Sequence, residues 1–404
     1  MRTQEEQRNL PIPDTRPALV YIESQRDYAA ILEQISAEPD MAAARFFVPN
    51  AAHCVAFLEA AREAGIEIED RLLHYNTISP EHDEAIYTCA LEAATLLYNL
   101  TLSCSGMIYG DRNRFVYPDT RWAFIAGLVD RFAGQMRPTL ELETRIRCLD
   151  PSSIYLFPSP GSEAYTSLAA VQASAGGRPV ILKMDHLPES VRQRIRQRAT
   201  VPTRCRQWPV YDLASLELAR RGNVLLMGNF KDRQYHYAMK PILPMLAKRH
   251  GLVLAEYIPG SPPGWLNDAD IAQLKPAYLG RITSETVFQL TETDTLFVTS
   301  VVRRFRHALS MTTGLAARCA GLLALFTSRI LFPLLLHARD TRTCALAVLR
   351  SCSAVVVVPG RTLEPNVFVG CAQALGIPTF EIQSGTNFPV TALHQASGRS
   401  YNGD

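Results

Sequence analysis

Short apolar runs alternate with amphipathic stretches along most of the chain. The runs at residues 18–22 and 45–48 are each followed by a segment with helical spacing, and the same order recurs at 154–182, 223–256 and 353–381. Apolar runs of about four to eight residues, separated by helices, are typical of strands that are buried on both faces of a parallel sheet. The pattern therefore predicts an α/β protein with parallel sheets.

The length predicts two or three domains. At 404 residues the chain exceeds the span of about 100–200 residues that one domain usually takes. Apolar periodicity fails and charge rises between residues 200 and 222, so we predict Rossmann-like domains at 1–215 and 216–404. Each half carries a helical insertion, and the one in the first domain spans 81–148. Only eighteen residues follow Thr386, which leaves a truncated second domain as an alternative.

Two segments share one plan, which supports two similar units. Residues 153–186 and 354–386 each read as an apolar strand, a loop with Pro-Gly, an Ala-rich helix, a Gly-Xaa-Pro turn and a second strand. Shared α/β construction alone can also produce this likeness, since such folds recur without a common function.

Composition and missing motifs exclude several classes of protein. With 47% hydrophobic residues, 20% charged residues and a net charge of +2, the chain is globular and is not expected to bind nucleic acid. The nine cysteines form no CxxC pair, which favours reduced thiols in the cytoplasm, and the His and Cys spacings predict no metal site. The chain has no GxGxxG, GxxxxGK[ST] or GxSxG motif, and its N-terminus does not read as a signal peptide.

One apolar stretch, residues 314–337, has the length of a membrane span. Arg318 and Arg329 interrupt it, and Pro333 is expected to break it. A span needs about 20 apolar residues with few or no charges, so we predict a buried or half-buried helix. Peripheral contact with the inner face of the cytoplasmic membrane remains the alternative.

Two loops lie where an α/β sheet binds its ligands, at the carboxyl ends of strands. The first is Pro-Gly-Arg-Thr-Leu-Glu at 359–364, and the second is Gln-Ser-Gly-Thr at 383–386. Arginine can hold a phosphate or carboxylate, a carboxylate can hold sugar hydroxyls, and small residues leave backbone N–H groups free for an anion. The predicted binding residues here are Gly360, Arg361, Glu364, Gln383, Ser384, Gly385 and Thr386. Glu364 as a simple helix cap is the alternative.

The stretch VVVVPGRTLEPNVFVGCAQALGIPTFEIQSGT, at 355–386, resembles bacterial GT-B glycosyltransferases of capsule and lipopolysaccharide synthesis. In that family a Gly-Ile-Pro-Thr turn and an apolar strand are followed by Gln-His-Gly, whereas Ser384 replaces the histidine here. NVLLMGNFKDRQYHYAMKPILPML, at 223–246, is similar to the opening of such a Rossmann unit. The resemblance covers about residues 222–386, and the first half follows it only in general pattern.

The resemblance implies transfer of a sugar from a nucleotide-activated donor to a surface-polysaccharide or lipopolysaccharide acceptor. Enzymes of the Kdo and sialic-acid type, which use CMP-sugars such as CMP-Kdo, lie in this neighbourhood. No cofactor beyond the donor is implied. The alternatives are a nucleotide-sugar epimerase of the same fold and a non-catalytic module that binds a glycan or a partner protein.

Glycosyl transfer needs an acidic group beside the reacting sugar. Asp232 follows the strand at 223–228, and Glu163 and Asp185 follow strands in the first half. Lys231 and Arg233 flank Asp232 and are the predicted partners for phosphate or a sugar carboxylate. Each acidic residue also fits a helix cap or a solvated loop.

We expect Asp232→Asn to abolish transfer to an acceptor glycan while the nucleotide still binds, because binding and chemistry use different groups. Lys231 and Arg233 should keep the carboxylate ionised and able to act as a base. Transfer assays on the purified variant check this. A variant that keeps a tenth of the wild-type rate, a barrier change of about 1.4 kcal/mol, would show that Asp232 is not the catalytic carboxylate. Glu163 or Asp185 would then be the candidate.

Overall fold

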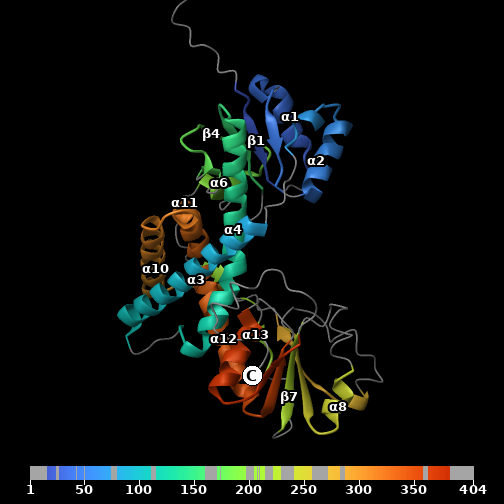
Figure 1. Ribbon diagram of the computed structural model, residues 1–404, viewed down its shortest axis with the longest axis vertical. Helices are drawn as coiled ribbons and strands as arrows, with labels where there is room; N and C mark the ends of the chain where they lie inside the picture. Colours follow the sequence, from blue (N-terminus) through green and yellow to red (C-terminus); the bar gives the residue numbers. More distant parts are fainter. Residues whose placement is uncertain are drawn as a thin grey trace, which may run out of the picture. The chain divides into compact units, whose positions relative to one another are not determined.

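The chain folds into two compact α/β units. The computed structural model describes residues 16–23, 27–41, 43–49, 51–73, 80–110, 115–159, 171–172, 174–196, 204–206, 208, 210–213, 222–228, 241–256, 272–282, 287–357 and 363–382. Unit 1 comprises residues 1–79 and 135–198, and unit 2 comprises residues 80–134 and 199–404 (Figure 1). This division differs from the predicted boundary at 215/216, because residues 80–134 belong with the second half of the chain.

Unit 1 is built on a four-stranded parallel sheet. Its strands are β1 (Leu19–Ile22), β2 (Arg45–Phe47), β3 (Ile154–Phe157) and β4 (Val180–Leu182), in the order β2-β1-β3-β4. The helices are α1 (Ala29–Ala37), α2 (Ala51–Glu63), α6 (Glu189–Arg196) and the second half of α4 (Arg121–Leu149). Short 3-10 turns occur at η1 (Pro39–Met41) and η2 (Glu69–Arg71).

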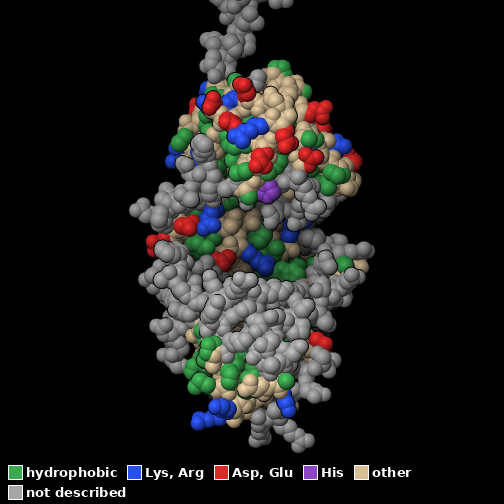
Figure 2. Space-filling view, turned by 90° about the vertical axis from the view of Figure 1, so that its right-hand side faces the viewer, with side chains coloured by type: hydrophobic (Ala, Val, Ile, Leu, Met, Phe, Trp, Pro, Cys, Tyr) green, Lys and Arg blue, Asp and Glu red, His purple; other side chains and the backbone are tan. Residues whose placement is uncertain are grey.

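Alternate residues of β1 face opposite sides of this sheet. Val20 and Ile22 belong to one hydrophobic cluster, in which Ile31 and Phe57 come from α1 and α2. Leu19 and Tyr21 belong to a second cluster, whose helical part includes Leu142 and Ile146 of α4. The two-residue period of a strand thus gives each face of the sheet its own core. On the face drawn in Figure 2, acidic and basic side chains are interspersed over the described part of unit 1.

Unit 2 contains a five-stranded parallel sheet and a layer of long helices. The strands are β7 (Asn223–Gly228), β8 (Gly251–Glu256), β9 (Ala277–Leu279), β12 (Cys352–Val357) and β13 (Thr379–Glu381), in the order β13-β12-β7-β8-β9. The prediction that residues 222–258 and 353–386 contribute strands to one parallel sheet is therefore confirmed. The mixed α/β architecture with two Rossmann-like units is confirmed with it.

Helices cover this sheet on both faces. Leu243 of α8 (Leu243–Ala247) packs with alternate residues of β7 and β8 on one side. Helices α12 (Ala320–Leu349) and α13 (Leu363–Ala374) contact β12. The helical layer also contains α3 (Pro80–Tyr109), η3 (Pro118–Thr120), the first half of α4, α10 (Glu292–Ser310) and α11 (Leu315–Arg318). Figure 1 shows α3 and α10 beside one another, and these two helices are in contact.

Two small antiparallel pairs complete the described part of unit 2. Strand β5 (Arg204–Arg206) pairs with β11 (Val287–Gln289), and β6 (Val210–Tyr211) pairs with β10 (Arg281–Ile282). The helix α10 begins at a capping box, in which Thr291 and Asp294 each bond the other's backbone N–H. Such a box satisfies donors that the first turn of a helix leaves open.

The apolar stretch near residue 320 forms one continuous helix. Pro333 lies inside α12, which runs to Leu349, so the expected break at this proline is wrong. Helix α12 is long and apolar enough to cross a membrane, yet 67% of its most apolar window is buried within the protein. The prediction of a buried core helix is thereby supported, since packed neighbours replace the lipid.

One close approach of backbone fixes α13 against η3. A Cβ atom on Gly370 of α13 would lie 2.0 Å from the carbonyl oxygen of Asp119. Only glycine fits here because the opposing atom is backbone and has no rotamer to change. Beside it, the Asp119 carboxylate accepts two hydrogen bonds from Nε of Arg342, at 3.0 and 2.9 Å. Helices α12 and α13 are therefore both tied to η3.

We expect Gly370→Ala to destabilise the protein by about 1–3 kcal/mol, the usual range for overpacking. A glycine-to-alanine change in an open helix position normally does the opposite and stabilises by up to about 1 kcal/mol. Gly106→Ala in α3, where an added Cβ meets no atom within 4 Å, is the matched control. Urea unfolding of both variants decides the matter, and equal stability would refute the close packing.

Candidate functional site

The strand order of unit 2 has a reversal point at one edge of the sheet. Along the sheet, the chain runs outward from β7 to β8 and β9, then returns to add β12 and β13 on the other side of β7. In an open α/β sheet, ligands bind at the carboxyl ends of the strands where this reversal occurs. Here that point lies between Gly228, the last residue of β7, and Val357, the last residue of β12. Helix α13 begins shortly after, at Leu363.

A buried carboxylate occupies the first turn of α13. Glu364 is 8% exposed, and its Oε1 lies 2.8 Å from Nε2 of His337 on α12. The imidazole is also buried, with 1% of its side chain exposed. Among the described residues, Nδ1 of His337 has no hydrogen-bond partner. The pair therefore links α13, which begins near the reversal point, to the core helix α12.

Two further side chains enclose this pair. The Trp208 ring lies 5.2 Å from the His337 ring, edge to face, and Cζ of Arg131 lies 4.6 Å from the centre of the Trp208 ring. Burial lowers the pKa of the Arg131 guanidinium, and the Glu364 carboxylate opposes that shift. We call Arg131, Trp208, His337 and Glu364 the Glu364 cluster. A positive guanidinium near the carboxylate makes its burial tolerable.

A second acidic residue lies at the same sheet edge. Glu381 ends β13 and pairs in register with Val357 of β12. Burial raises the pKa of Glu381 from 4.5 to about 7. A carboxyl group that titrates near neutral pH can both accept and release a proton, which general acid–base catalysis requires.

Unit 1 has its own reversal point, between β1 and β3. Glu23 follows β1, is 4% exposed, and accepts a hydrogen bond from the backbone N–H of Ser159, after β3, at 2.7 Å. Beyond β4, Nε2 of His186 lies 2.9 Å from the carbonyl oxygen of Pro158. Burial lowers the pKa of His186, which favours the neutral imidazole. This edge is held together by contacts between its own loops.

The structure describes two of the predicted site residues. Asp185 lies on a turn after β4 with 79% of its side chain exposed, and its Oδ1 is 3.4 Å from Nη1 of Arg192. Glu364 is buried in its cluster, so it is more than the cap of a helix and does not face open solvent. The other predicted residues, which lie outside the described residues, are Glu163, Lys231, Asp232, Arg233, Gly360, Arg361, Gln383, Ser384, Gly385 and Thr386.

Sequence patterns alone did not identify several residues at the two sheet edges. Arg131 and His337 lie inside long helices, far along the chain from any strand end, so no local pattern marks them. Glu23 and Glu381 each stand at or directly after the end of a short apolar strand. That position at a strand end is a signal that sequence alone can provide. Among the described residues, no group of three or more His, Cys, Asp and Glu side chains is arranged to hold a metal ion.

Comparison with known proteins leaves the family open. No protein-family model matches the chain, and no curated protein matches it. A C2-type ketoreductase of a modular polyketide synthase is similar at 11% identity over 94% of this chain and 85% of its own, with a TM-score of 0.19. A-type ketoreductases from a modular polyketide synthase give 13% identity, coverages of 91% and 80%, and a TM-score of 0.19. Similarity this low transfers nothing of ketoreductase chemistry to this chain.

We expect Glu381→Gln to raise the melting temperature at pH 8 and to leave it nearly unchanged at pH 4. Because the folded-state pKa is raised, the stability that the neutral Glu381 carboxyl contributes is fully present below about pH 4.5. It is lost as the pH rises through about 7. Glutamine stays neutral throughout. Thermal unfolding at both pH values checks this, with Glu292→Gln, an exposed carboxylate on α10, as control. A pH-independent difference at Glu381 would contradict the burial of its charge.

Proposed function

We propose that this protein is a glycosyltransferase that moves a sugar from a nucleotide-activated donor, with a CMP-sugar favoured, to a polysaccharide or lipopolysaccharide acceptor. The observation that carries the proposal is the reversal point between β7 and β12, where the Glu364 cluster fixes the first turn of the bordering helix. Rossmann-like units bind nucleotides at this place in the sheet. The sequence resemblance at 222–386 supplies the reaction class, and it falls on the same strands.

In this proposal the Glu364 cluster positions the binding site. The buried contact between Glu364 and His337 holds the start of α13 against α12. A helix start that is held in place before binding loses less conformational entropy when a nucleotide binds. The positive charge of Arg131 acts on the Glu364 carboxylate in this buried setting.

We also propose that Glu381 provides acid–base chemistry at this edge of the sheet. Glu381 ends the strand beside β12, and its pKa near 7 suits a group that takes the proton of an acceptor hydroxyl. In the proposed reaction the acceptor oxygen attacks the anomeric carbon, the bond from that carbon to the nucleotide phosphate breaks, and the hydroxyl proton passes to the base. Glu381 thus joins Asp232 as a candidate base.

A thermal-shift series with CMP, CDP, UDP and GDP tests the nucleotide site. We expect one of them to raise the melting temperature, because a ligand at 100 times its dissociation constant stabilises the folded state by about 2.7 kcal/mol. Glu364→Gln should weaken the binding of that nucleotide by about tenfold, since the start of α13 loses its contact with His337 of α12. Titration of the dissociation constant for wild type and variant measures this.

The matched control is Glu292→Gln, which changes an exposed first-turn carboxylate of α10 in the same unit. It should leave nucleotide affinity unchanged. If none of the four nucleotides shifts the wild-type protein, the transferase proposal fails. If Glu364→Gln lowers stability but keeps wild-type affinity, the cluster serves the fold and not the site.

A further inference from the structure

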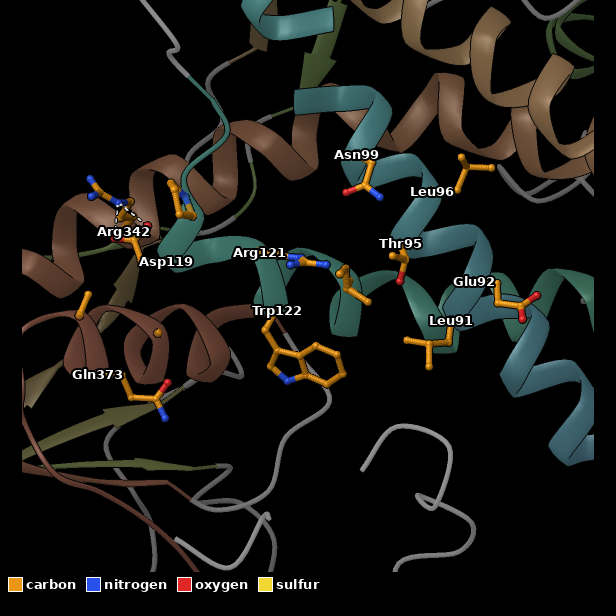
Figure 3. Close-up of a pocket in the computed structure, with 14 residues that line it drawn as sticks. Leu91, Glu92, Thr95, Leu96, Asn99, Asp119, Arg121, Trp122, Arg342 and Gln373 are labelled. Atoms are coloured by element: carbon orange, nitrogen blue, oxygen red, sulfur yellow. Dashed lines mark hydrogen bonds and ion pairs between the residues drawn. The ribbon is translucent and has the colours of Figure 1, made fainter. Parts of the chain in front are cut away.

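A large cavity lies in the helical layer of unit 2. It has a volume of about 1150 Å³, and its walls come from α3, η3, the start of α4, α12 and α13 (Figure 3). This volume slightly exceeds the range that small-molecule sites usually occupy, about 300–1,000 Å³. None of the residues of the Glu364 cluster lines it. Gln373, on its wall, follows Glu364 by nine residues in α13, or about 13 Å along a helix.

An aromatic ring and planar polar side chains share this cavity. Figure 3 shows Trp122 between Gln373 of α13 and the α3 residues Leu91 and Thr95. Trp122 is half-buried, so part of its ring is accessible. Apolar contact from the indole and from Leu91 thus stands beside hydroxyl and amide groups. Such a combination suits a ligand that is apolar on one face and polar at its edges.

The charged groups of the cavity differ in their partners. Asp119 and Arg342 satisfy each other through two hydrogen bonds, and Cζ of Arg342 lies 4.2 Å from the centre of the Tyr117 ring. Arg121 and Glu92 form no ion pair within the described part of the chain, and both are exposed. Cζ of Arg121 lies 5.8 Å from the centre of the Tyr98 ring, a contact that leaves its N–H groups open to a ligand, as the Glu92 carboxylate is.

We propose that this cavity binds a carbohydrate segment. A sugar ring presents C–H groups on one face, which pack against an indole, and hydroxyl pairs at its edge. A carboxylate, an amide or a guanidinium each bonds two neighbouring hydroxyls with parallel hydrogen bonds. Glu92, Asn99, Arg121 and Gln373 supply these groups around Trp122. The volume accommodates more than one sugar ring.

The cavity is preformed by backbone packing. Gly370 brings α13 into contact with the carbonyl of Asp119, and the Asp119–Arg342 pair ties η3 to α12. The walls therefore hold their positions before a ligand arrives, which lowers the entropy lost on binding. The inference names the acceptor site of the proposed transferase and rests on that function to this extent, whereas carbohydrate binding itself does not require it.

A printed array of neutral and acidic oligosaccharides, probed with the full-length protein, tests the site. We expect the wild-type protein to retain a defined subset of these glycans. Trp122→Ala should weaken the retained glycans by at least tenfold, and Trp122→Phe should keep most of the affinity because it keeps an aromatic face. Arg121→Gln should also weaken binding, and Arg303→Gln on α10, an exposed arginine outside the cavity, should not.

Asn99→Ala and Gln373→Ala keep the test decisive if Trp122→Ala fails to fold, because both side chains are exposed. Loss of glycan binding in either variant supports the site. Absence of any retained glycan, or wild-type retention by every cavity variant, overturns the inference.

The thermal-shift series separates this inference from the proposed function. If the protein binds a nucleotide but retains no glycan, the acceptor site is refuted and the transferase proposal stands. If the protein binds no nucleotide but retains glycans in a way that depends on Trp122, the transferase proposal is refuted. The protein is then a carbohydrate-binding protein.

Discussion

A parallel β-sheet has to bury both of its faces, and this constraint organises each unit of the chain. In unit 1, neighbouring residues of β1 enter two different hydrophobic clusters, one with α1 and α2 and the other with α4. In unit 2, α8 packs against one face of the sheet, and α12 and α13 contact β12. Once both faces are covered, only the ends of the strands remain open to ligands.

The Glu364 cluster shows how a charge is kept inside such a covered structure. Glu364 lies where a helix begins beside the sheet edge, and burial there is unfavourable for a lone carboxylate. His337 bonds it directly, and Arg131, stacked on Trp208, adds a positive charge nearby. Removing one partner alone would leave the charges of the others buried without a compensating charge. The cluster therefore behaves as one unit, drawn from four separate segments of the chain.

The helical layer of unit 2 adds a second environment that the sheet alone would not provide. Residues 80–134 join a fold whose sheet comes from the second half of the sequence. Their contact with α12 and α13 depends on Gly370 and on the pair of Asp119 and Arg342. The cavity that results faces polar and aromatic side chains from helices, and the sheet edge presents carboxylates at strand ends. Two chemically different sites thus follow from one unit.

The sequence by itself determined most strands of the two parallel sheets and most of the helices, but it did not predict β9 or the two antiparallel pairs. The apolar runs at 223–228, 251–256 and 352–357 are short, continuous and separated by helical spacing, so local pattern was enough. It also placed Glu364 at the head of a helix near a sheet edge. It failed at Pro333, because the buried neighbours Phe332 and Leu334 pack α12 against the rest of unit 2 and hold a proline that an isolated helix would not tolerate.

Only the tertiary structure assembled each of the two candidate sites from distant segments of the chain. His337 and Arg131 are single residues within long helices, and their meeting with Glu364 joins segments up to 233 residues apart in the sequence. The cavity around Trp122 likewise needs α3, α4, α12 and α13 in one layer. Sequence periodicity reports which face of an element is buried, whereas the partner of that face is chosen by packing among distant segments, and no local pattern records that choice.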